Sequence, residues 1–184
     1  MAASETDNLD NPFWQFSLAV YAAPGVADEC LALQERYAAD VNVLLFGSWL
    51  AAARGAALKP QDVESIRAHV SAWHESAVKP LRGVRRWLKD QPGAATSALR
   101  GRIKAAELEA EQIEQAMLFA YAQVRWPAAA DAGEADLAPA NLEVYLQALG
   151  YDGAGDEALP CGHLCAAVRA LSSGRERVTA MGRT

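Results

Sequence analysis

Eight lysine and arginine side chains lie close together in the middle of the chain, between residues 79 and 104. If residues 79–89 form a helix, its five cations fall within about one third of the circumference, and three more follow on the next predicted helix. Such a cluster can bind the phosphates of RNA or DNA, or an anionic lipid surface, through charge alone. We predict that this basic tip contacts an anionic partner through Lys79, Arg82, Arg85, Arg86, Lys89, Arg100, Arg102 and Lys104.

The distribution of charge offers a second interpretation of the basic tip. The chain has a net charge of −6, yet residues 54–104 carry eleven cations against four acids. Residues 1–40 carry seven acids against one arginine, and residues 105–184 carry twelve acids against five arginines. The cations can therefore pair with Glu107 and with the acidic first forty residues as an ordinary solvated surface, and the acidic net charge favours this interpretation over nonspecific binding of nucleic acid.

Three glutamates on one predicted helix have the composition of metal ligands but not the spacing. Glu107, Glu111 and Glu114 share one helical face. A di-iron site also needs Glu-x-x-His motifs, and neither His69 nor His74 follows a glutamate by three positions. We therefore predict that the glutamates form a solvent-exposed face.

Three potential soft-metal ligands occur within five residues near the end of the chain, at Cys161, His163 and Cys165. Zinc usually takes four ligands in two paired groups, and no second group is visible. We predict ordinary thiols and a surface imidazole, so the sequence indicates neither a metal site nor a cofactor. The odd number of cysteines, three in all, argues against a disulfide framework and favours a reducing cytoplasm.

Aromatic and polar side chains of the first three predicted helices form an alternative candidate site. A pocket among these helices would be lined by Trp14, Tyr21, Asn42 and Trp49 and could hold a small molecule. Capping offers a simpler explanation of two polar residues. Asp40 can cap the third helix, and Asn42 lies in its first turn, where backbone N–H groups are free.

Motifs for several kinds of enzymatic chemistry are absent from the sequence. It contains no Gly-x-Ser-x-Gly or Gly-x-x-x-x-Gly-Lys pattern, no Gly-x-Gly-x-x-Gly after a strand, and no helical aspartate pair that could hold Mg²⁺ for a diphosphate. The neighbours His74 and Glu75 invite an acid–base interpretation, but consecutive residues of a helix point in different directions. These observations favour a protein that is not an enzyme and leave catalysis open.

Two ladders of apolar residues predict the helices that carry the basic tip. One ladder runs from Val63 to Leu88, and the other runs from Leu99 to Val124 in steps of four and three. A helix with this spacing shows one apolar stripe to a partner helix. A turn at residues 90–93 would bring Leu88 onto Leu99 and Val63 onto Val124.

Proline, glycine and capping residues place the helices along the chain. We predict helices over residues 12–23, 26–38, 41–54, 60–89 with a kink at Pro80, 97–125, 139–149 and 160–171. The uncharged helix at 41–54 is expected to be central, and no strand pattern occurs. The predicted fold is all-α, a six- to seven-helix bundle around a long antiparallel helical hairpin.

The chain is predicted to have three parts. Residues 1–10 form a disordered acidic N-terminus, residues 11–150 a helical domain, and residues 151–184 a C-terminal extension with a short helix and a frayed tail. Residues 128–138 have no apolar period and are predicted to be a loop or linker. No run reaches the roughly 18–20 apolar residues that span a membrane, and the first ten residues lack the regions of a signal peptide.

Five blocks of the sequence resemble a bacterial family of conserved hypothetical proteins. The blocks are 11–21, 24–26 with 30–34, 40–46 with 49–52, Trp73 with 79–82, and 104–115. The family is domain of unknown function 2390, and the resemblance covers residues 11–125. It implies a bacterial setting, but it carries no established activity, cofactor or catalytic residue.

Three functions remain open from the sequence. The first is a cytoplasmic, non-enzymatic binding or adaptor protein whose basic tip meets an acidic protein or RNA. The second is a small-molecule-binding or enzymatic helical bundle with a pocket among the first three helices, and the third is a homodimer formed through the apolar surface of the first helix. A basic tip unpaired with the protein's own acids would favour the first, and a cavity holding partly buried polar groups would favour the second.

Overall fold

The structure, a computed structural model, describes residues 8–127, 137–153 and 159–181, with side chains as far as residue 173. Within these residues every regular element is a helix. The elements are α1 (Pro12–Tyr21), α2 (Val26–Tyr37), α3 (Val41–Arg54), α4 (Pro60–Trp73), the π-helical turn η2 (His74–Val78), α5 (Lys79–Leu88), α6 (Ala94–Arg125), α7 (Ala138–Gln147) and α8 (Gly162–Met181). Because α4, η2 and α5 follow one another without a break, they form one bent rod, which makes seven helical rods in the described ranges. The prediction of an all-α fold with six or seven helices is confirmed.

Side chains at the predicted caps begin the first and third helices. Oδ1 of Asn11 accepts hydrogen bonds of 3.0 Å from the backbone N–H groups of Phe13 and Trp14. Oδ1 of Asp40 accepts one of 2.9 Å from the backbone N–H of Asn42. These caps satisfy backbone donors that have no partner inside the helix. They also fix where α3 begins, and therefore where the side chains of Asp40 and Asn42 lie.

A π-helical turn stands where the sequence predicts a kink at Pro80. The turn η2 follows α4 directly, and Pro80 lies in the first turn of α5. Proline has no N–H, and its ring collides with the carbonyl four residues earlier, so the regular α-helical ladder cannot continue through it. A π turn takes up one extra residue at such a point. The turn starts at His74, whose side chain is buried.

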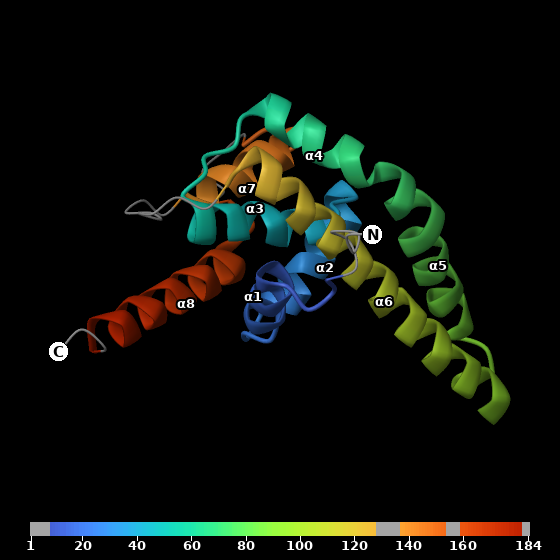
Figure 1. Cartoon of the computed structure of the whole chain (residues 1–184). Coiled ribbons are helices and arrows are strands. Elements are labelled where there is room, and N and C mark those ends of the chain that lie inside the picture. Colours follow the sequence, from blue (N-terminus) through green and yellow to red (C-terminus); the bar gives the residue numbers. More distant parts are fainter. Residues whose placement is uncertain (1–7, 128–136, 154–158, 182–184) are drawn as a thin grey trace, which may run out of the picture.

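The bent rod of α4, η2 and α5 lies beside α6 (Figure 1). Contacts between the two rods occur in opposite order along the chain. Asp62, near the start of α4, accepts a hydrogen bond of 2.9 Å from Arg125 at the end of α6. Arg85, near the end of α5, pairs with Glu107 in the first half of α6.

The predicted register of the two ladders is wrong at the end of the rods far from the basic tip. Val63 is 1% exposed, whereas its predicted partner Val124 is 80% exposed. A straight α-helix drifts by about 20° per heptad relative to a strict repeat of 3.5 residues. A stripe that starts at Leu99 has therefore turned toward solvent by the time it reaches Val124.

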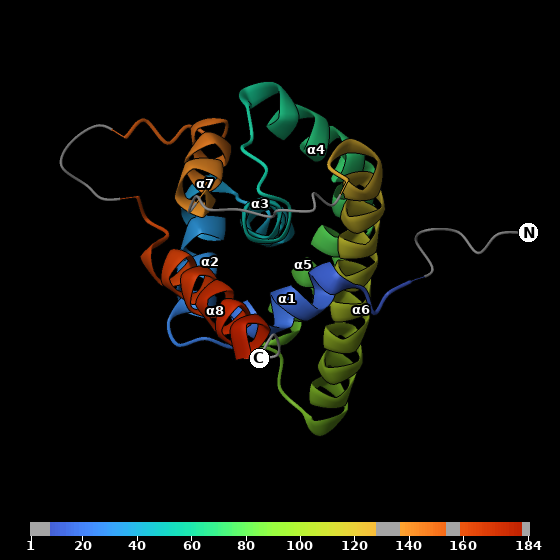
Figure 2. The same cartoon turned by 60° about the vertical axis from the view of Figure 1, so that its left-hand side comes forward.

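Helix α3, which carries no charge before Arg54, lies in the middle of the molecule, as its composition predicts. Figure 2 looks almost along its axis and shows the other helices arranged around it, and α3 contacts α1, α2, α6, α7 and α8. Every residue from Asn42 to Ala51 is buried. The centroids of the Phe13 and Phe119 rings lie 5.5 and 5.7 Å from that of Trp49, at the centre of the core.

The short helix α7 is fastened to α3 by one buried asparagine. The side-chain amide of Asn141 donates to the carbonyls of Gly47 at 3.0 Å and Ala56 at 2.9 Å. Its Oδ1 accepts a hydrogen bond of 2.8 Å from the backbone N–H of Leu58. This attachment matters for the site because it fixes α7, which carries Tyr145.

Helix α8 is longer than the short helix predicted over residues 160–171. Glu29 accepts hydrogen bonds at its start from the backbone N–H groups of His163, at 2.9 Å, and Leu164, at 2.8 Å. Once the first turn is capped, each further residue adds a backbone hydrogen bond. The helix runs as far as Met181, beyond the predicted end at residue 171.

Parts of the predicted organisation lie outside the described residues. These are residues 1–7 of the acidic N-terminus, 128–136 of the linker and 182–184 of the tail. The division at residue 150 stays a prediction, although α8 packs against α1, α2 and α3. In the described ranges no single helix has both the length and the apolar composition to cross a membrane, and α1 and α2, bent by 99°, pass that test only as a pair.

Candidate functional site

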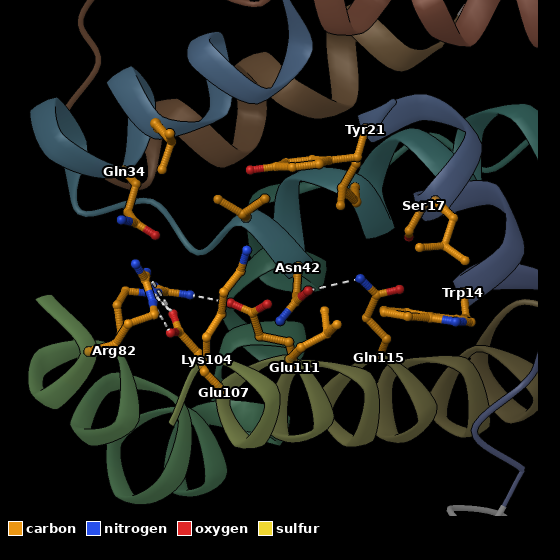
Figure 3. A pocket seen from close by; sticks show the side chains of 16 residues that line it. Trp14, Ser17, Tyr21, Gln34, Asn42, Arg82, Lys104, Glu107, Glu111 and Gln115 are labelled. Atoms are coloured by element: carbon orange, nitrogen blue, oxygen red, sulfur yellow. Dashed lines mark hydrogen bonds and ion pairs between the residues drawn. The ribbon is translucent and has the colours of Figure 1, made fainter. Parts of the chain in front are cut away.

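A cavity of about 460 Å³ lies among α1, α2, α3, α5 and α6, which places it in the size range of small-molecule pockets (Figure 3). Its apolar wall consists of Trp14, Leu18, Leu31, Val41, Leu45 and Leu108. Three of the four predicted pocket residues, Trp14, Tyr21 and Asn42, line this cavity. The fourth, Trp49, does not, because it is packed in the core. We call this space the ligand cavity.

Polar side chains in the wall of the ligand cavity form a directed chain of hydrogen bonds. The side-chain amide of Asn42 donates to Oε2 of Glu114 at 2.8 Å, so its Oδ1 faces the other way and accepts from Nε2 of Gln115 at 2.9 Å. Gln115 must then turn its own Oε1 away from Asn42, and this oxygen has no hydrogen-bond partner. The Oγ of Ser17 has none either. Both Gln115 and Ser17 line the cavity and are 3% exposed.

One end of the ligand cavity is charged. Arg82 donates to Glu111 at 2.6 Å and to Glu107 at 3.1 Å, and Arg85 also pairs with Glu107. Burial raises the pKa of the Glu111 carboxyl, while the ion pair with Arg82 acts in the opposite direction. Lys104 lines the same end and has no carboxylate within 4.0 Å among the described residues. The lining therefore holds three cations against two carboxylates.

These contacts divide the predicted basic tip into two groups. Lys79, Arg82 and Arg85 have carboxylate partners, and that of Lys79 is Glu75 at 2.5 Å. In the part of the chain that the structure describes, five residues of the tip have no carboxylate within 4.0 Å: Arg86, Lys89, Arg100, Arg102 and Lys104. The tip is therefore not a continuous set of free cations, and the acids that pair with its arginines lie on α6 instead of in the first forty residues.

The prediction that three glutamates of α6 form a solvent-exposed face is wrong. Glu114 is fully buried, Glu107 is 5% exposed, and Glu111 is half-buried. Glu107 and Glu114 are seven residues apart, and the buried Ala110 lies between them in the sequence. Glu107, Ala110 and Glu114 therefore lie on the inward stripe of the helix. That spacing is the signal from which their burial could have been inferred.

Glu114 belongs to a buried cluster that also contains Asp40 and His74. Nδ1 of His74 lies 3.0 Å from Oδ2 of Asp40 and 3.0 Å from Oε1 of Glu114. Asn42 holds the other oxygen of each carboxylate: its backbone N–H donates to Oδ1 of Asp40 at 2.9 Å, and its side chain donates to Oε2 of Glu114. The backbone N–H of Asp40 donates to the hydroxyl of Tyr145 at 2.9 Å. We call Asp40, His74 and Glu114 the Asp–His–Glu cluster.

Burial and mutual contacts shift the pKa of all three groups of the cluster. Burial opposes the charged imidazole, but hydrogen bonds to Asp40 and Glu114 outweigh it and raise the pKa of His74 to about 10. Burial, with the nearby charge of Asp40, raises the pKa of Glu114 to about 7. Burial also acts to raise the pKa of Asp40, yet contact with His74 lowers it overall. These shifts describe a charged His74 between two carboxyl groups, with a proton on Glu114 near neutral pH.

A second cavity, of about 300 Å³, adjoins the cluster. Asp40, His74 and Tyr145 are among the residues that line it. Asn42 and Gln115 line the ligand cavity on the other side of the same hydrogen-bond network. The polar side chains around the start of α3 therefore separate two cavities and contact both.

One comparison with known proteins places the chain in a family. A family model described as a protein of unknown function, DUF2390, matches residues 12–118. The chain belongs to the DUF2390 family. No curated protein and no solved structure matches it. The segment matched by the DUF2390 model contains every lining residue of the ligand cavity and the whole Asp–His–Glu cluster, whereas Tyr145 lies beyond it.

The cysteine-rich segment of this DUF2390 protein does not assemble a metal position in the structure. Cys161 and Cys165 are buried cysteines that form no disulfide, His163 is exposed, and burial raises the pKa of Cys161. Within the described ranges, one group of three His, Cys, Asp or Glu side chains has its ligand atoms all within 4.8 Å of one another, and it is the Asp–His–Glu cluster. No local pattern in the sequence reveals this group, because its members lie far apart in the chain.

Proposed function

We propose that this DUF2390 protein binds a small organic anion in the ligand cavity. The observation that carries the proposal is the pair of buried polar atoms without partners, Oγ of Ser17 and Oε1 of Gln115, in residues that line the cavity. A buried polar atom without a hydrogen bond costs about 1–3 kcal/mol of folding free energy. A ligand that supplies the missing partner removes this cost, so the two atoms are explained if the cavity is built for an occupant.

The lining specifies three features of the ligand. Oε1 of Gln115 can only accept a hydrogen bond, so the ligand needs an N–H or O–H group at that position. The apolar wall around Trp14 and Leu45 favours an aromatic or alkyl body. Lys104 has no carboxylate partner, and cations outnumber carboxylates at that end, which favours a carboxylate, sulfonate or phosphate on the ligand.

A dye with all three features tests the proposal. Anilinonaphthalene sulfonate has aromatic rings, an N–H group and a sulfonate, and its fluorescence rises in an apolar site. We expect one dye to bind per chain, and we expect Leu108→Trp to weaken binding about tenfold or more, because the larger ring fills the cavity wall. Leu99→Trp is the matched control, since Leu99 is also an exposed leucine of α6 and does not line the cavity.

Two further variants test the polar contacts. Gln115→Met removes the free acceptor and keeps the length of the side chain, and Lys104→Glu reverses the charge at the other end. Both should weaken dye binding, while Arg102→Glu, an exposed change on the same helix outside the cavity, should not. Far-ultraviolet circular dichroism checks that each variant folds. Equal affinity in Leu108→Trp, Lys104→Glu and the wild type would place the dye elsewhere and contradict the proposal.

A second candidate function uses the part of the basic tip that faces away from the cavity. Trp87 is 64% exposed, and the exposed cations Arg86 and Lys89 lie beside it in the chain. An aromatic ring among free cations suits an RNA strand or an acidic protein segment, which is the adaptor role that the basic tip predicts. A fluorescent single-stranded RNA titrated at increasing salt tests this role. Affinity should fall steeply with salt and in Arg86→Glu, and no binding at low salt would exclude RNA as the partner.

The proposal has three further parts, which concern the arrangement of the helices, the compartment and the oligomeric state. The opposite order of contacts between the bent rod and α6 supports the antiparallel hairpin as the organising element of the fold. None of the three cysteines, all of them in the described ranges, forms a disulfide, which supports a reducing compartment such as the cytoplasm. The exposed side chains Leu18 and Tyr21 on α1 offer the surface through which a homodimer would form.

A further inference from the structure

Three helical elements bring one imidazole nitrogen and two carboxylate oxygens to a single buried point. Nδ1 of His74, at the start of η2, is 3.0 Å from Oδ2 of Asp40, the cap of α3, and 3.0 Å from Oε1 of Glu114 in α6. We propose that Asp40, His74 and Glu114 bind one divalent transition-metal ion, with Zn²⁺ as the ion to be tested. This site is separate from the ligand cavity, and the proposal does not depend on ligand binding there.

The separations between the ligand atoms fit a metal ion. Bonds of about 2.0–2.1 Å to Zn²⁺ in tetrahedral geometry place neighbouring ligand atoms roughly 3.3–3.4 Å apart. Two of the three separations in the cluster are 3.0 Å, so side-chain shifts of a few tenths of an ångström would admit the ion, and all three atoms lie within 4.8 Å of one another. Imidazole nitrogen with carboxylate oxygen is a donor set for zinc or manganese, whereas soft copper(I) prefers sulfur.

A second set of hydrogen bonds orients the two carboxylates toward this point. Asn42 occupies the outer oxygen of each, Oδ1 of Asp40 through its backbone and Oε2 of Glu114 through its side chain. The inner oxygens, Oδ2 and Oε1, are the ones nearest to His74, at 3.0 Å each, and Oε2 of Glu114 lies 3.3 Å from the same nitrogen. Hydrogen bonds to the outer atoms of ligating carboxylates are typical of metal sites, where they hold the ligands in position and tune their basicity.

The charge of the cluster also calls for a cation. Two carboxylates meet where Glu114 is fully buried, and two ionised acids so close together repel one another strongly unless something neutralises them. A divalent ion held between the two carboxylates neutralises both acids at once.

The second cavity gives the site an approach and an open position. Asp40 and His74 line this space of about 300 Å³, so an ion held by the cluster would face it. Zinc sites with three protein ligands keep their fourth position for water or another exchangeable molecule. The hydroxyl of Tyr145 and the guanidinium of Arg67 belong to the same cavity, so polar groups are present beside the open position.

Calorimetry on the full chain, stripped with a chelator and kept reduced, tests the proposal. We expect one Zn²⁺ per chain, and about tenfold or greater loss of affinity in Asp40→Asn and in Glu114→Gln. Both variants keep the fold-defining contacts, because Asn also caps a helix and Gln can still accept from Asn42. Glu109→Gln is the matched control, an exposed glutamate five residues before Glu114 on the same helix, and it should bind as the wild type does.

Cobalt(II) absorption identifies the donor atoms. We expect the weak visible bands that nitrogen and oxygen ligands give, and these bands should disappear in His74→Gln. They should remain in His69→Gln, the control, which changes an exposed histidine of α4. A strong thiolate charge-transfer band would mean that the cysteines hold the ion. That result would overturn the proposal. So would the absence of stoichiometric Zn²⁺ binding, or equal Zn²⁺ affinity in the wild type, Asp40→Asn and Glu114→Gln.

Discussion

The side-chain amide of Asn42 donates a hydrogen bond of 2.8 Å to Oε2 of Glu114, a residue 72 positions later in the chain. This contact orients Glu114 toward His74 on one side. It also orients Asn42 toward Gln115 on the other side, where Gln115 presents its free oxygen among the residues of the ligand cavity. One buried hydrogen bond at the start of α3 thus links both candidate sites.

Replacing Asn42 should weaken the fold substantially. Asn42→Leu removes the partner of the buried Glu114 carboxyl and of the Gln115 amide at once. Unpaired buried polar groups are costly, so we expect the free energy of unfolding to fall by about 2–4 kcal/mol. Urea denaturation measures it. Gln61→Leu is the control, because it changes an exposed amide on α4, and its free energy of unfolding should stay within about 0.5 kcal/mol of the wild type. An equally small effect of Asn42→Leu would show that the network contributes little.

Removing the unpaired hydroxyl of Ser17 should raise the free energy of unfolding instead of lowering it. Because Oγ of Ser17 is buried without a hydrogen bond, we expect Ser17→Ala to raise the free energy of unfolding by about 0.5–1 kcal/mol in the ligand-free protein. Ser48→Ala is the control, since Oγ of Ser48 donates to the Leu44 carbonyl at 3.0 Å, and it should destabilise by about 1 kcal/mol. Denaturation curves that show Ser17→Ala to be the more destabilising of the two would mean that the hydroxyl has a partner.

Two neighbouring arginines of the basic tip should respond differently to charge reversal. Arg85→Glu places a third carboxylate against Glu107 and Glu111 in a half-buried position, and we expect it to lower the free energy of unfolding by about 2 kcal/mol. Arg86→Glu alters an exposed side chain without a carboxylate partner, so stability should change by less than about 0.5 kcal/mol. Thermal and urea melts of both variants distinguish them, and similar effects would mean that the Arg85 pair is not structural.

The chelator-treated protein should become less stable as the pH rises from about 5 to 10. The folded-state pKa of Glu114, about 7, exceeds its ordinary value of 4.5, so its proton stabilises the fold at low pH and this contribution is lost as the pH rises through 7. His74 has the same sign, with a contribution that is complete below 6.5 and lost as the pH rises through about 10. Asp40, whose pKa is lowered, contributes above pH 3.8 and loses that contribution in acid.

Urea denaturation at a series of pH values measures this dependence. Glu114→Gln has no proton to lose at this position, so the decrease in stability around pH 7 should become smaller in that variant. The same slope in Glu114→Gln and the wild type would assign the pH dependence to other groups. Glu109→Gln serves again as the control, because an exposed glutamate should leave the curve unchanged.

Helix positions could be predicted because their signals are local. Asn11 and Asp40 cap helices through atoms only two or three residues away, and proline or glycine ends a helix at its own position. The central place of α3 was predictable too, since a run without charges is stable only when buried. Trp14, Tyr21 and Asn42 line a cavity in the structure, whereas Trp49 could not be separated from them by residue type alone.

The sequence by itself therefore determined an all-α chain, its central helix and most helix boundaries to within a few residues, although the end of α8 lies ten residues beyond the predicted one. Only the tertiary structure decided which polar side chains meet. Asp40 had an adequate explanation as a cap and Glu114 as part of a charged face, and both explanations use neighbours on the same helix. A carboxylate beside an apolar stripe is solvated by default, and its burial becomes favourable only when a partner such as His74 or Asn42 arrives from another helix. The packing of the helices supplies that partner, and no local pattern encodes it.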